Sequence, residues 1–341
     1  MTMNSGNSHA MAEVEKLRES LEDHKKRWLA IGTVVNIVVI TVVYSTAIHT
    51  HSVRDQIILL ALLSFFTAFI CWIVWTCAAV PYRLRFQFMF KQRVVLPELQ
   101  LAGFKDMEYA AATYETAQGA RFTPDSKPCI FPQISPFITE DTLRHSLKFK
   151  FFNYMEGKDF IRASYKDCRF TRENLTLQHS SGSGKSSRLK TIFAGAFISV
   201  KSKKAYPARL IIYTFNNPSF YLPKRQTRLL DTLDNSAKEK LAADGITFNH
   251  DFCVTGDTPS KSTRTMLSPR RMEWLKQIDT LFPGDIMLLF EDRSLYVFAS
   301  DVFDFDAFES GKKTIDEQRL AVRDDINIFV KQLDALIESE W

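Results

Sequence analysis

The chain has 341 residues, of which 45% are hydrophobic and 24% charged, and it carries a net charge of +5. These proportions exclude a disordered or collagen-like chain, and the length is sufficient for two domains of ordinary size. The charge is unevenly distributed, because residues 28–80 contain only one basic and one acidic residue, Arg54 and Asp55. An almost uncharged segment is therefore joined to a charged remainder.

Two apolar runs, residues 28–48 and 57–80, predict a transmembrane hairpin of two helices. A helix over the first run would be about 31 Å long, which matches the hydrocarbon thickness of a bilayer. The linker at 49–56 is too short to hold a domain, so the second helix returns to the starting side. A buried hairpin of a soluble domain is the alternative interpretation. Basic residues flank both outer ends and place both termini in the cytoplasm of a multi-pass inner-membrane protein: Lys25, Lys26, Arg27, Arg83, Arg85, Lys91 and Arg93.

Asn36 lies in the middle of the first run, where its amide needs a partner other than lipid. We expect a helix–helix contact within the hairpin, or with a second copy of the chain in a homo-oligomer. The five cysteines include no CxxC pair, and their odd number favours reduced, buried thiols over a disulfide framework. Residue spacing indicates no catalytic constellation, cofactor or metal site.

The remaining patterns predict an α+β protein. We expect a polar tail with a short charged helix in 1–27, the hairpin in 28–80, a juxtamembrane helix in 81–103 interrupted by Pro97, and a cytoplasmic domain of helices and antiparallel strands in 104–341. Helical patterns cover residues 10–26, 99–117, 224–243, 269–282 and 314–340, and residues 139–155 form a helix or a helix–strand junction. Strand patterns cover residues 160–170, 174–178, 191–201, 208–215, 246–254 and the hairpin 285–291/295–300.

The juxtamembrane helix has an apolar stripe formed by Tyr82, Phe86, Phe90 and Val94, four residues apart. This stripe suits a helix lying among the lipid headgroups, and equally a helix packed on the following domain.

One segment resembles a phosphate-binding loop. Gly184, Lys185 and Ser186 fit the second half of the G-x-x-x-x-G-K-[ST] pattern, but His179 occupies the position of its first glycine. The residues after the loop are typical of a strand, whereas a phosphate-binding loop leads into a helix. A Ser/Gly-rich turn between two strands therefore explains the segment better than nucleotide binding does.

The charges of the domain are segregated along the sequence. No acidic residue occurs between Glu173 and Asp231, whereas eight acidic residues and one basic residue occupy the segment from Asp279 to Glu309. The basic segment could contact the anionic inner leaflet or an acidic protein, or could face the acidic segment within the fold. Nucleic acid is not expected, because no RNA-binding module is recognisable. The candidate residues for anionic-surface binding are Lys201, Lys203, Lys204, Arg209, Lys224, Arg225 and Arg228.

Short motifs resemble a family of bacterial membrane proteins catalogued as domain of unknown function 3137. Phe193, Gly195 and Phe197 match its Phe-x-Gly-x-Phe pattern, and Val254, Asp257 and Arg264 precede Leu267-Ser268-Pro269 in the expected order. Thr255 and Ser268 replace the family's Tyr and Thr. The resemblance spans roughly residues 25–310 and implies no catalytic residues, since the family has no established activity.

These observations lead to one main hypothesis and two alternatives. The main hypothesis is an inner-membrane protein whose cytoplasmic domain binds a protein partner or the membrane lipid of the inner leaflet. The alternatives are a nucleotide-binding enzyme that uses Gly184, Lys185 and Ser186, and a subunit of a membrane complex with Asn36 in a helix interface.

Overall fold

The computed structural model describes residues 5–47, 58, 61–62, 64–70, 72–73, 86, 89–110, 114–117, 152, 154–181, 188–214, 227–229, 239, 244, 247–256, 266–282, 284–300 and 314–337. The chain divides into two compact units. Unit 1 comprises Met1–Pro97 and Asp306–Ala321, and unit 2 comprises Glu98–Phe305 and Val322–Trp341. Among the described residues, no helix has the length and apolar character needed to cross a bilayer.

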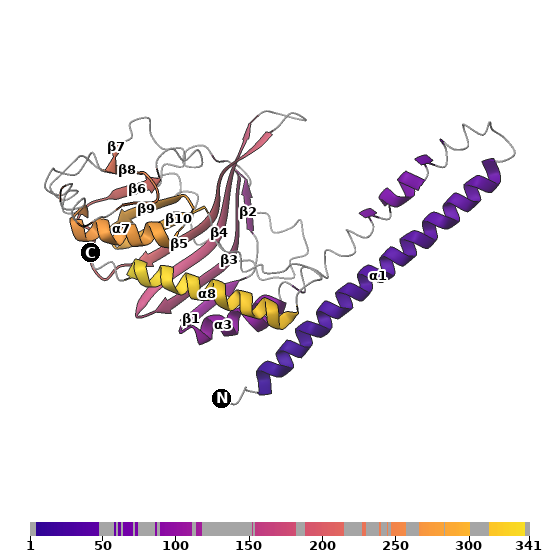
Figure 1. Ribbon diagram of the computed structural model, residues 1–341, viewed down its shortest axis with the longest axis horizontal. Helices are drawn as coiled ribbons and strands as arrows, with labels where there is room; N and C mark the ends of the chain where they lie inside the picture. The colour runs from indigo at the N-terminus through magenta and orange to yellow at the C-terminus, as the bar shows by residue number, and fades with distance from the viewer. Residues whose placement is uncertain are drawn as a thin grey trace. The chain divides into compact units, whose positions relative to one another are not determined.

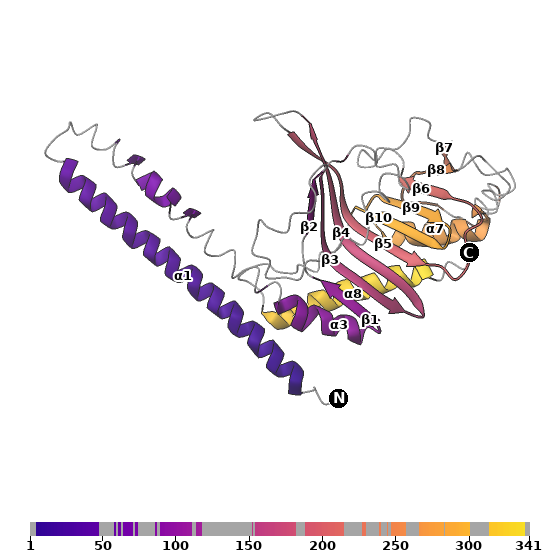
Figure 2. The same cartoon turned by 180° about the vertical axis from the view of Figure 1, so that it is seen from behind.

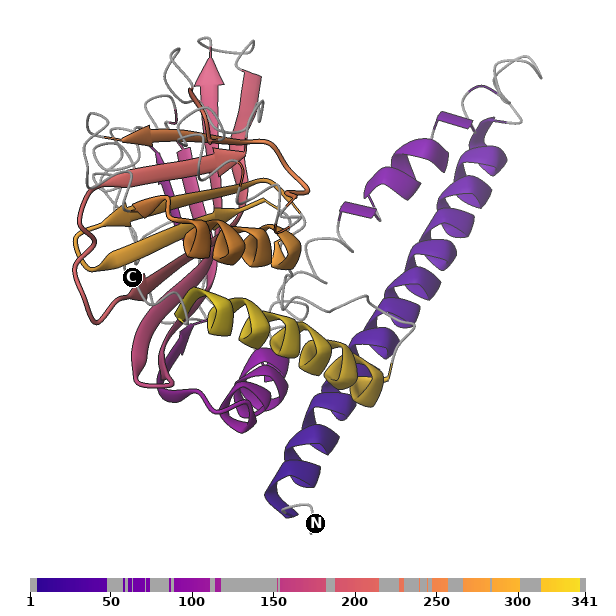
Figure 3. The same cartoon turned by 60° about the vertical axis from the view of Figure 1, so that its left-hand side comes forward.

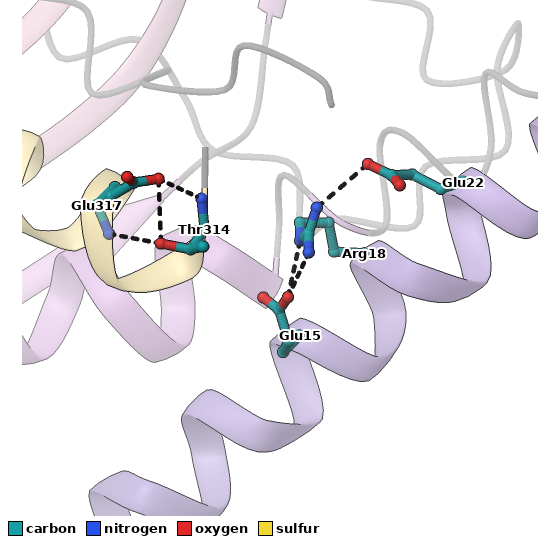
Figure 4. Close-up of polar contacts among 5 residues, drawn as sticks. All are labelled: Glu15, Arg18, Glu22, Thr314 and Glu317. Carbon is teal, nitrogen blue, oxygen red and sulfur yellow. Dashed lines mark hydrogen bonds and ion pairs between the residues drawn. The ribbon is translucent and has the colours of Figure 1, made fainter. Parts of the chain in front are cut away.

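Unit 1 contains the long helix α1 (Ser5–Ala47) and the π-helical turn η1 (Lys91–Val95). The charged helix predicted in 10–26 and the first apolar run are parts of this one continuous helix (Figure 1). Val14 is fully buried, and Glu13 Oε2 lies 3.7 Å from Arg93 Nη2, so the N-terminal part of α1 packs beside η1. Arg18 pairs with Glu15 and Glu22 on the same helix (Figure 4).

Pro97 does not interrupt the helix as predicted, because it is the second residue of α3 (Leu96–Leu101). Proline has no N–H to donate to the carbonyl four residues earlier. The preceding turn is a π-turn in which the N–H of Leu96 bonds to the carbonyl of Lys91. The widened turn lets the helical chain pass through the proline.

Unit 2 is built on a ten-stranded sheet in the order β1-β3-β4-β5-β10-β9-β6-β8-β7, with β2 also paired to β3 (Figures 1 and 2). Neighbouring described strands are antiparallel. The strands are β1 (Lys105–Ala110), β2 (Tyr114–Ala117), β3 (Tyr154–Tyr165), β4 (Cys168–Ser181), β5 (Arg188–Lys201), β6 (Leu210–Thr214), β7 (Thr227–Arg228), β8 (Phe252–Gly256), β9 (Ile286–Glu291) and β10 (Ser294–Ala299).

Helix α7 (Pro269–Leu281) and the unit 2 part of α8 (Ile315–Ile337) cover one face of the sheet (Figure 3). The ring of Trp274 in α7 lies 6.1 Å from that of Phe290, and Phe329 in α8 lies 5.7 Å from Phe170. The opposite face carries a second buried cluster that includes Phe193, Phe197, Phe298, Met287 and Leu289. Both faces are thus apolar in the middle strands, as their continuous burial requires.

Most predicted strands and helices of unit 2 are confirmed. Strands β5 and β6, the β9–β10 hairpin, α7 with Ser268 at its N-cap, and α8 form where the patterns place them. The predicted strand over 160–170 is instead the end of β3, a two-residue turn and the start of β4. Lys166 and Asp167 have φ values of 46° and 63°, which match the twist of a tight hairpin.

Two helix predictions are wrong in part. The helix expected over 99–117 ends at Leu101, because Gly103 adopts φ +95° and turns the chain into β1 and then β2. Within the helix expected over 224–243, Thr227 and Arg228 form β7, whereas the other two described residues, Leu229 and Glu239, are helical. Of the segment 139–155, Tyr154 and Met155 begin β3, and Phe152 is the other described residue.

Candidate functional site

The candidate site is a basic end of the sheet, formed where three connections meet. The β5–β6 connection and the β9–β10 turn are hydrogen-bonded to each other: the N–H of Ser202 donates to the carbonyl of Arg293 over 2.9 Å, and that of Tyr206 to the carbonyl of Asp292 over 2.6 Å. Lys201 Nζ also donates to Ser294 Oγ over 2.7 Å. Two short loops therefore form one ordered surface.

The start of α7 belongs to the same end of the sheet. Tyr206 is buried, its ring lies 5.2 Å from that of Phe290, and it interacts electrostatically with Arg271 in the first turn of α7. Burial raises the pKa of Tyr206 to about 12, so its phenol is neutral, and burial lowers the pKa of Arg271. The N-terminus of α7 adds a partial positive charge to this region.

We define the basic end as residues 201–209, 268–271 and 291–294. It carries seven basic side chains and two acidic ones, Glu291 and Asp292. Lys203 and Lys204 are exposed at the tip of the β5–β6 connection, and Arg293 and Arg270 are exposed beside it. Arg209 Nε donates to Glu291 Oε1 over 2.9 Å, so one cation of the basic segment faces the acidic segment within the fold. The basic side chains are Lys201, Lys203, Lys204, Arg209, Arg270, Arg271 and Arg293.

The structure brings together four of the seven residues predicted for anionic-surface binding: Lys201, Lys203, Lys204 and Arg209. Lys224 and Arg225 lie outside the described residues. Arg228 lies in β7 at the edge of the sheet, where it pairs with Cys253, away from the basic end. Sequence reasoning missed Arg270, Arg271 and Arg293, because they come from other segments and only the sheet topology joins them to the basic segment.

The segment with the nucleotide-binding candidates Gly184, Lys185 and Ser186 lies outside the described residues. Its flanks are antiparallel strands, since Ser181 of β4 pairs with Arg188 of β5. The strand expected after the loop is therefore confirmed, and residues 188–201 supply no helix N-terminus for a phosphate. Nucleotide binding itself stays a prediction.

A histidine–carboxylate pair lies elsewhere in unit 2. Nδ1 of His250 is 2.6 Å from Oδ1 of Asp279, which is almost fully buried in α7. The other carboxylate oxygen accepts the backbone N–H groups of Asn249 and His250. Both oxygens of Asp279 thus hold the segment before β8 against α7, which is a structural role.

The residues that carry the predicted family motifs lie in the core of unit 2. Phe193 and Phe197 are buried against Phe298, with ring centroids 5.5 and 5.1 Å apart. Gly195 lies so close to β10 that a Cβ there would be 2.0 Å from the carbonyl oxygen of Ala299. The Phe-x-Gly-x-Phe pattern is therefore a packing motif, with two rings filling the core and a glycine admitting the neighbouring backbone.

No curated protein and no solved structure matches the chain significantly. Residues 191–338, from β5 to the end of α8, match the model of the family described as protein of unknown function (DUF3137), so the predicted resemblance to that family is confirmed for this part of the chain.

Proposed function

We propose that the chain is an inner-membrane protein, anchored by a hairpin of residues 28–80 with both termini in the cytoplasm, whose basic end binds the anionic headgroups of the inner leaflet. One observation carries the proposal: seven basic side chains and two acidic ones meet on two hydrogen-bonded turns and the start of α7, and Lys203 and Lys204 are exposed there. Basic side chains near an anionic membrane contribute about 1 kcal/mol each.

The apolar surface of unit 1 supports the anchor. Seven large apolar side chains of α1 from Leu29 to Val42 are 42–59% exposed, and eight from Ile58 to Ile73 are 41–68% exposed. Surfaces of this kind are unfavourable in water and mark contact with lipid or protein. Lys26 and Arg27 are exposed where the apolar part of α1 begins, as the positive-inside rule requires of a cytoplasmic end.

The contact between α1 and η1 supports the antiparallel arrangement of the hairpin. Glu13 and Arg93 lie at the same level, so the proposed hairpin would be antiparallel, with its two arms in the register that this ion pair sets. Oδ1 of Asn36 is buried without a hydrogen-bond partner among the described residues, and this register puts Asn36 level with about residue 70 of the second arm.

The lipid contact is testable by lysine footprinting of the full chain in nanodiscs. We expect acylation of Lys203 and Lys204 to be slower in discs that contain phosphatidylglycerol than in phosphatidylcholine discs, and high salt to abolish the difference. Lys331, exposed on α8, is the internal control and should react equally in both. Equal reactivity of Lys203 and Lys204 in the two lipids would contradict headgroup binding.

The same measurement distinguishes lipid from an acidic protein partner. Protection of Lys203 and Lys204 in native membranes, but not in protein-free anionic discs, would identify a protein as the bound surface.

Replacing both lysines by alanine should remove about 2 kcal/mol of attraction to the membrane. This corresponds to about a thirtyfold loss of the bound state, which the acylation rate of Lys201 would measure.

The topology has its own test. A reporter fused after Trp341 should give a cytoplasmic signal. A signal from the opposite side of the membrane would overturn the proposed orientation. It would not bear on headgroup binding by the basic end, which the lysine footprinting tests.

A further inference from the structure

Phe86 and the residues of and just before η1 follow the second predicted membrane span, and in unit 1 η1 packs beside α1. Three side chains of the apolar stripe of the predicted juxtamembrane helix are covered by protein: Phe86, Phe90 and Val94 are at most 2% exposed. The rings of Phe86 and Phe90 stack with centroids 6.1 Å apart. A helix lying among headgroups would instead expose its apolar stripe, so the burial favours the interpretation that this helix packs on protein.

The partner of this segment includes the N-terminal half of α1. Val14 is fully buried, Lys91 is 5% exposed, and the Glu13–Arg93 ion pair joins the two segments across 80 residues of sequence. Arg18, on this half of α1, is paired within the helix. Arg18 Nε donates to Glu15 over 3.0 Å, and Arg18 Nη1 donates to Glu22 over 3.1 Å (Figure 4). The Arg18 guanidinium, held between two carboxylates, is not available to lipid phosphates.

Helix α1 continues without a break from this paired region into the apolar segment that begins at Trp28. From Glu13 to Trp28 the helix rises about 22 Å, since each residue adds 1.5 Å. The Debye length at physiological ionic strength is about 8 Å, so charges near Glu13 are screened from a membrane whose surface lies at Trp28.

We propose that residues 5–27 of α1, together with Phe86 and residues 89–95, form a paired helical stalk that projects from the bilayer and carries the chain about 22 Å away from the headgroups. This inference rests on the proposed membrane anchor. The stalk is a spacer: its ion pairs and buried apolar side chains hold its two arms together, and it does not lie on the lipid surface.

The stalk is tested with fluorescent labels at single cysteines of the full chain in liposomes, after replacement of the five native cysteines. The labelled positions are Lys16, Arg27 and Val38, which are exposed on α1. Nitroxides on the acyl chains should quench the label at Val38, and nitroxides on the headgroups should quench the label at Arg27. The label at Lys16, about 18 Å from Trp28, should escape both quenchers.

The possible results separate the stalk from the anchor. Headgroup quenching at Lys16 as strong as at Arg27 would show the N-terminal half of α1 lying on the membrane and would overturn the stalk. Absence of acyl-chain quenching at Val38 would overturn the membrane anchor, and also the stalk, which rests on it.

Pairing of the two arms is tested independently by cross-linking. In the same cysteine-free background, Glu13→Cys combined with Arg93→Cys should be joined in the membrane by a short bifunctional thiol reagent, because the 3.7 Å contact lies between the tips of two long side chains and a disulfide needs closer Cα atoms. Asp23→Cys combined with Arg93→Cys is the matched control, because Asp23 lies about 15 Å farther along α1 and should not react. Equal yields from the two pairs would overturn the register, whichever way the quenching result falls.

Discussion

Replacement of Gly195 by alanine tests whether the glycine of the family motif is needed for packing. The added Cβ would lie 2.0 Å from the carbonyl oxygen of Ala299 and 2.9 Å from both the carbonyl carbon of Ala299 and Cα of Ser300. All three are backbone atoms, so no side-chain rotation relieves the clash, and β10 must move by about 1 Å or more to restore ordinary contact distances.

The cost of that movement has two parts. Overpacking a well-filled core costs about 1–3 kcal/mol, and each ladder hydrogen bond lost where Ala299 pairs with Ala196 costs about 1 kcal/mol more. We therefore expect Gly195→Ala to lower the free energy of unfolding by about 3–5 kcal/mol. In a domain of this size that is a fall in melting temperature of about 10 °C.

Thermal unfolding of the full chain, followed by circular dichroism, measures this effect. Ala194→Ser is the matched control, since Ala194 is exposed on the same strand. Surface substitutions usually change the free energy of unfolding by no more than about 0.5 kcal/mol, and we expect the same here. A Gly195→Ala protein that melts within 2 °C of the parent, roughly the shift that 0.5–1 kcal/mol produces, would refute the close approach of β10 to Gly195.

Three further substitutions probe the helices. Arg323 binds Glu98 through two hydrogen bonds of 2.9 and 3.2 Å, and Glu98 is 4% exposed, so Arg323→Ala should cost about 2 kcal/mol in urea unfolding, whereas the double variant with Glu98→Gln should recover part of the loss. Thr314 and Glu317 form a reciprocal cap at the start of α8 (Figure 4), and Thr314→Ala should cost about 1 kcal/mol, seen as faster amide exchange in the first turn of α8. Burial raises the pKa of Asp325, with a further contribution from Asp324, so its ionisation opposes folding as the pH rises from 3.8 through the raised value. Asp325→Asn should therefore be more stable than the parent at neutral pH and equal to it below pH 3.8; an unchanged difference across this range would contradict the assignment.

The patterns that predicted unit 2 correctly were those in which one local signal decides the structure. The middle of β5 and all of β6 are rich in apolar and β-branched residues, and Ser268-Pro269 combines an N-cap residue with a proline at the first helical position. Alternation alone did not reveal the turn at Lys166 and Asp167, because it contains neither glycine nor proline. Its positive φ values are imposed by the pairing of the two long strands β3 and β4.

The errors between residues 97 and 117 have a common cause. Leu99 and the residues after it fit a helical period, but Gly103 ends that helix, and Phe104 then inserts among the rings of Tyr165, Phe170 and Phe329. Partners from distant parts of the sequence thus decide the conformation of 105–110, and a local pattern contains no information about them.

The sequence predicts that the domain has a basic surface, but it does not predict all of the residues that form it. A charge count along the chain identifies Lys201, Lys203, Lys204 and Arg209, but it assigns Arg293 to an acidic segment and gives no role to Arg270 and Arg271. The fold brings these residues together because β5 and β10 are neighbours and α7 begins at the same end of the sheet.

The ion pair between Arg209 and Glu291 qualifies how the basic segment can act. Its side chains are 20% and 27% exposed, so it is only partly screened by water, and it removes one cation from the surface available to a ligand. Lys203 and Lys204 are exposed beyond it, on a connection fixed by backbone hydrogen bonds to the β9–β10 turn. Intramolecular neutralisation and external binding are therefore not exclusive: the first uses the cation next to the sheet, and the second uses those at the tip.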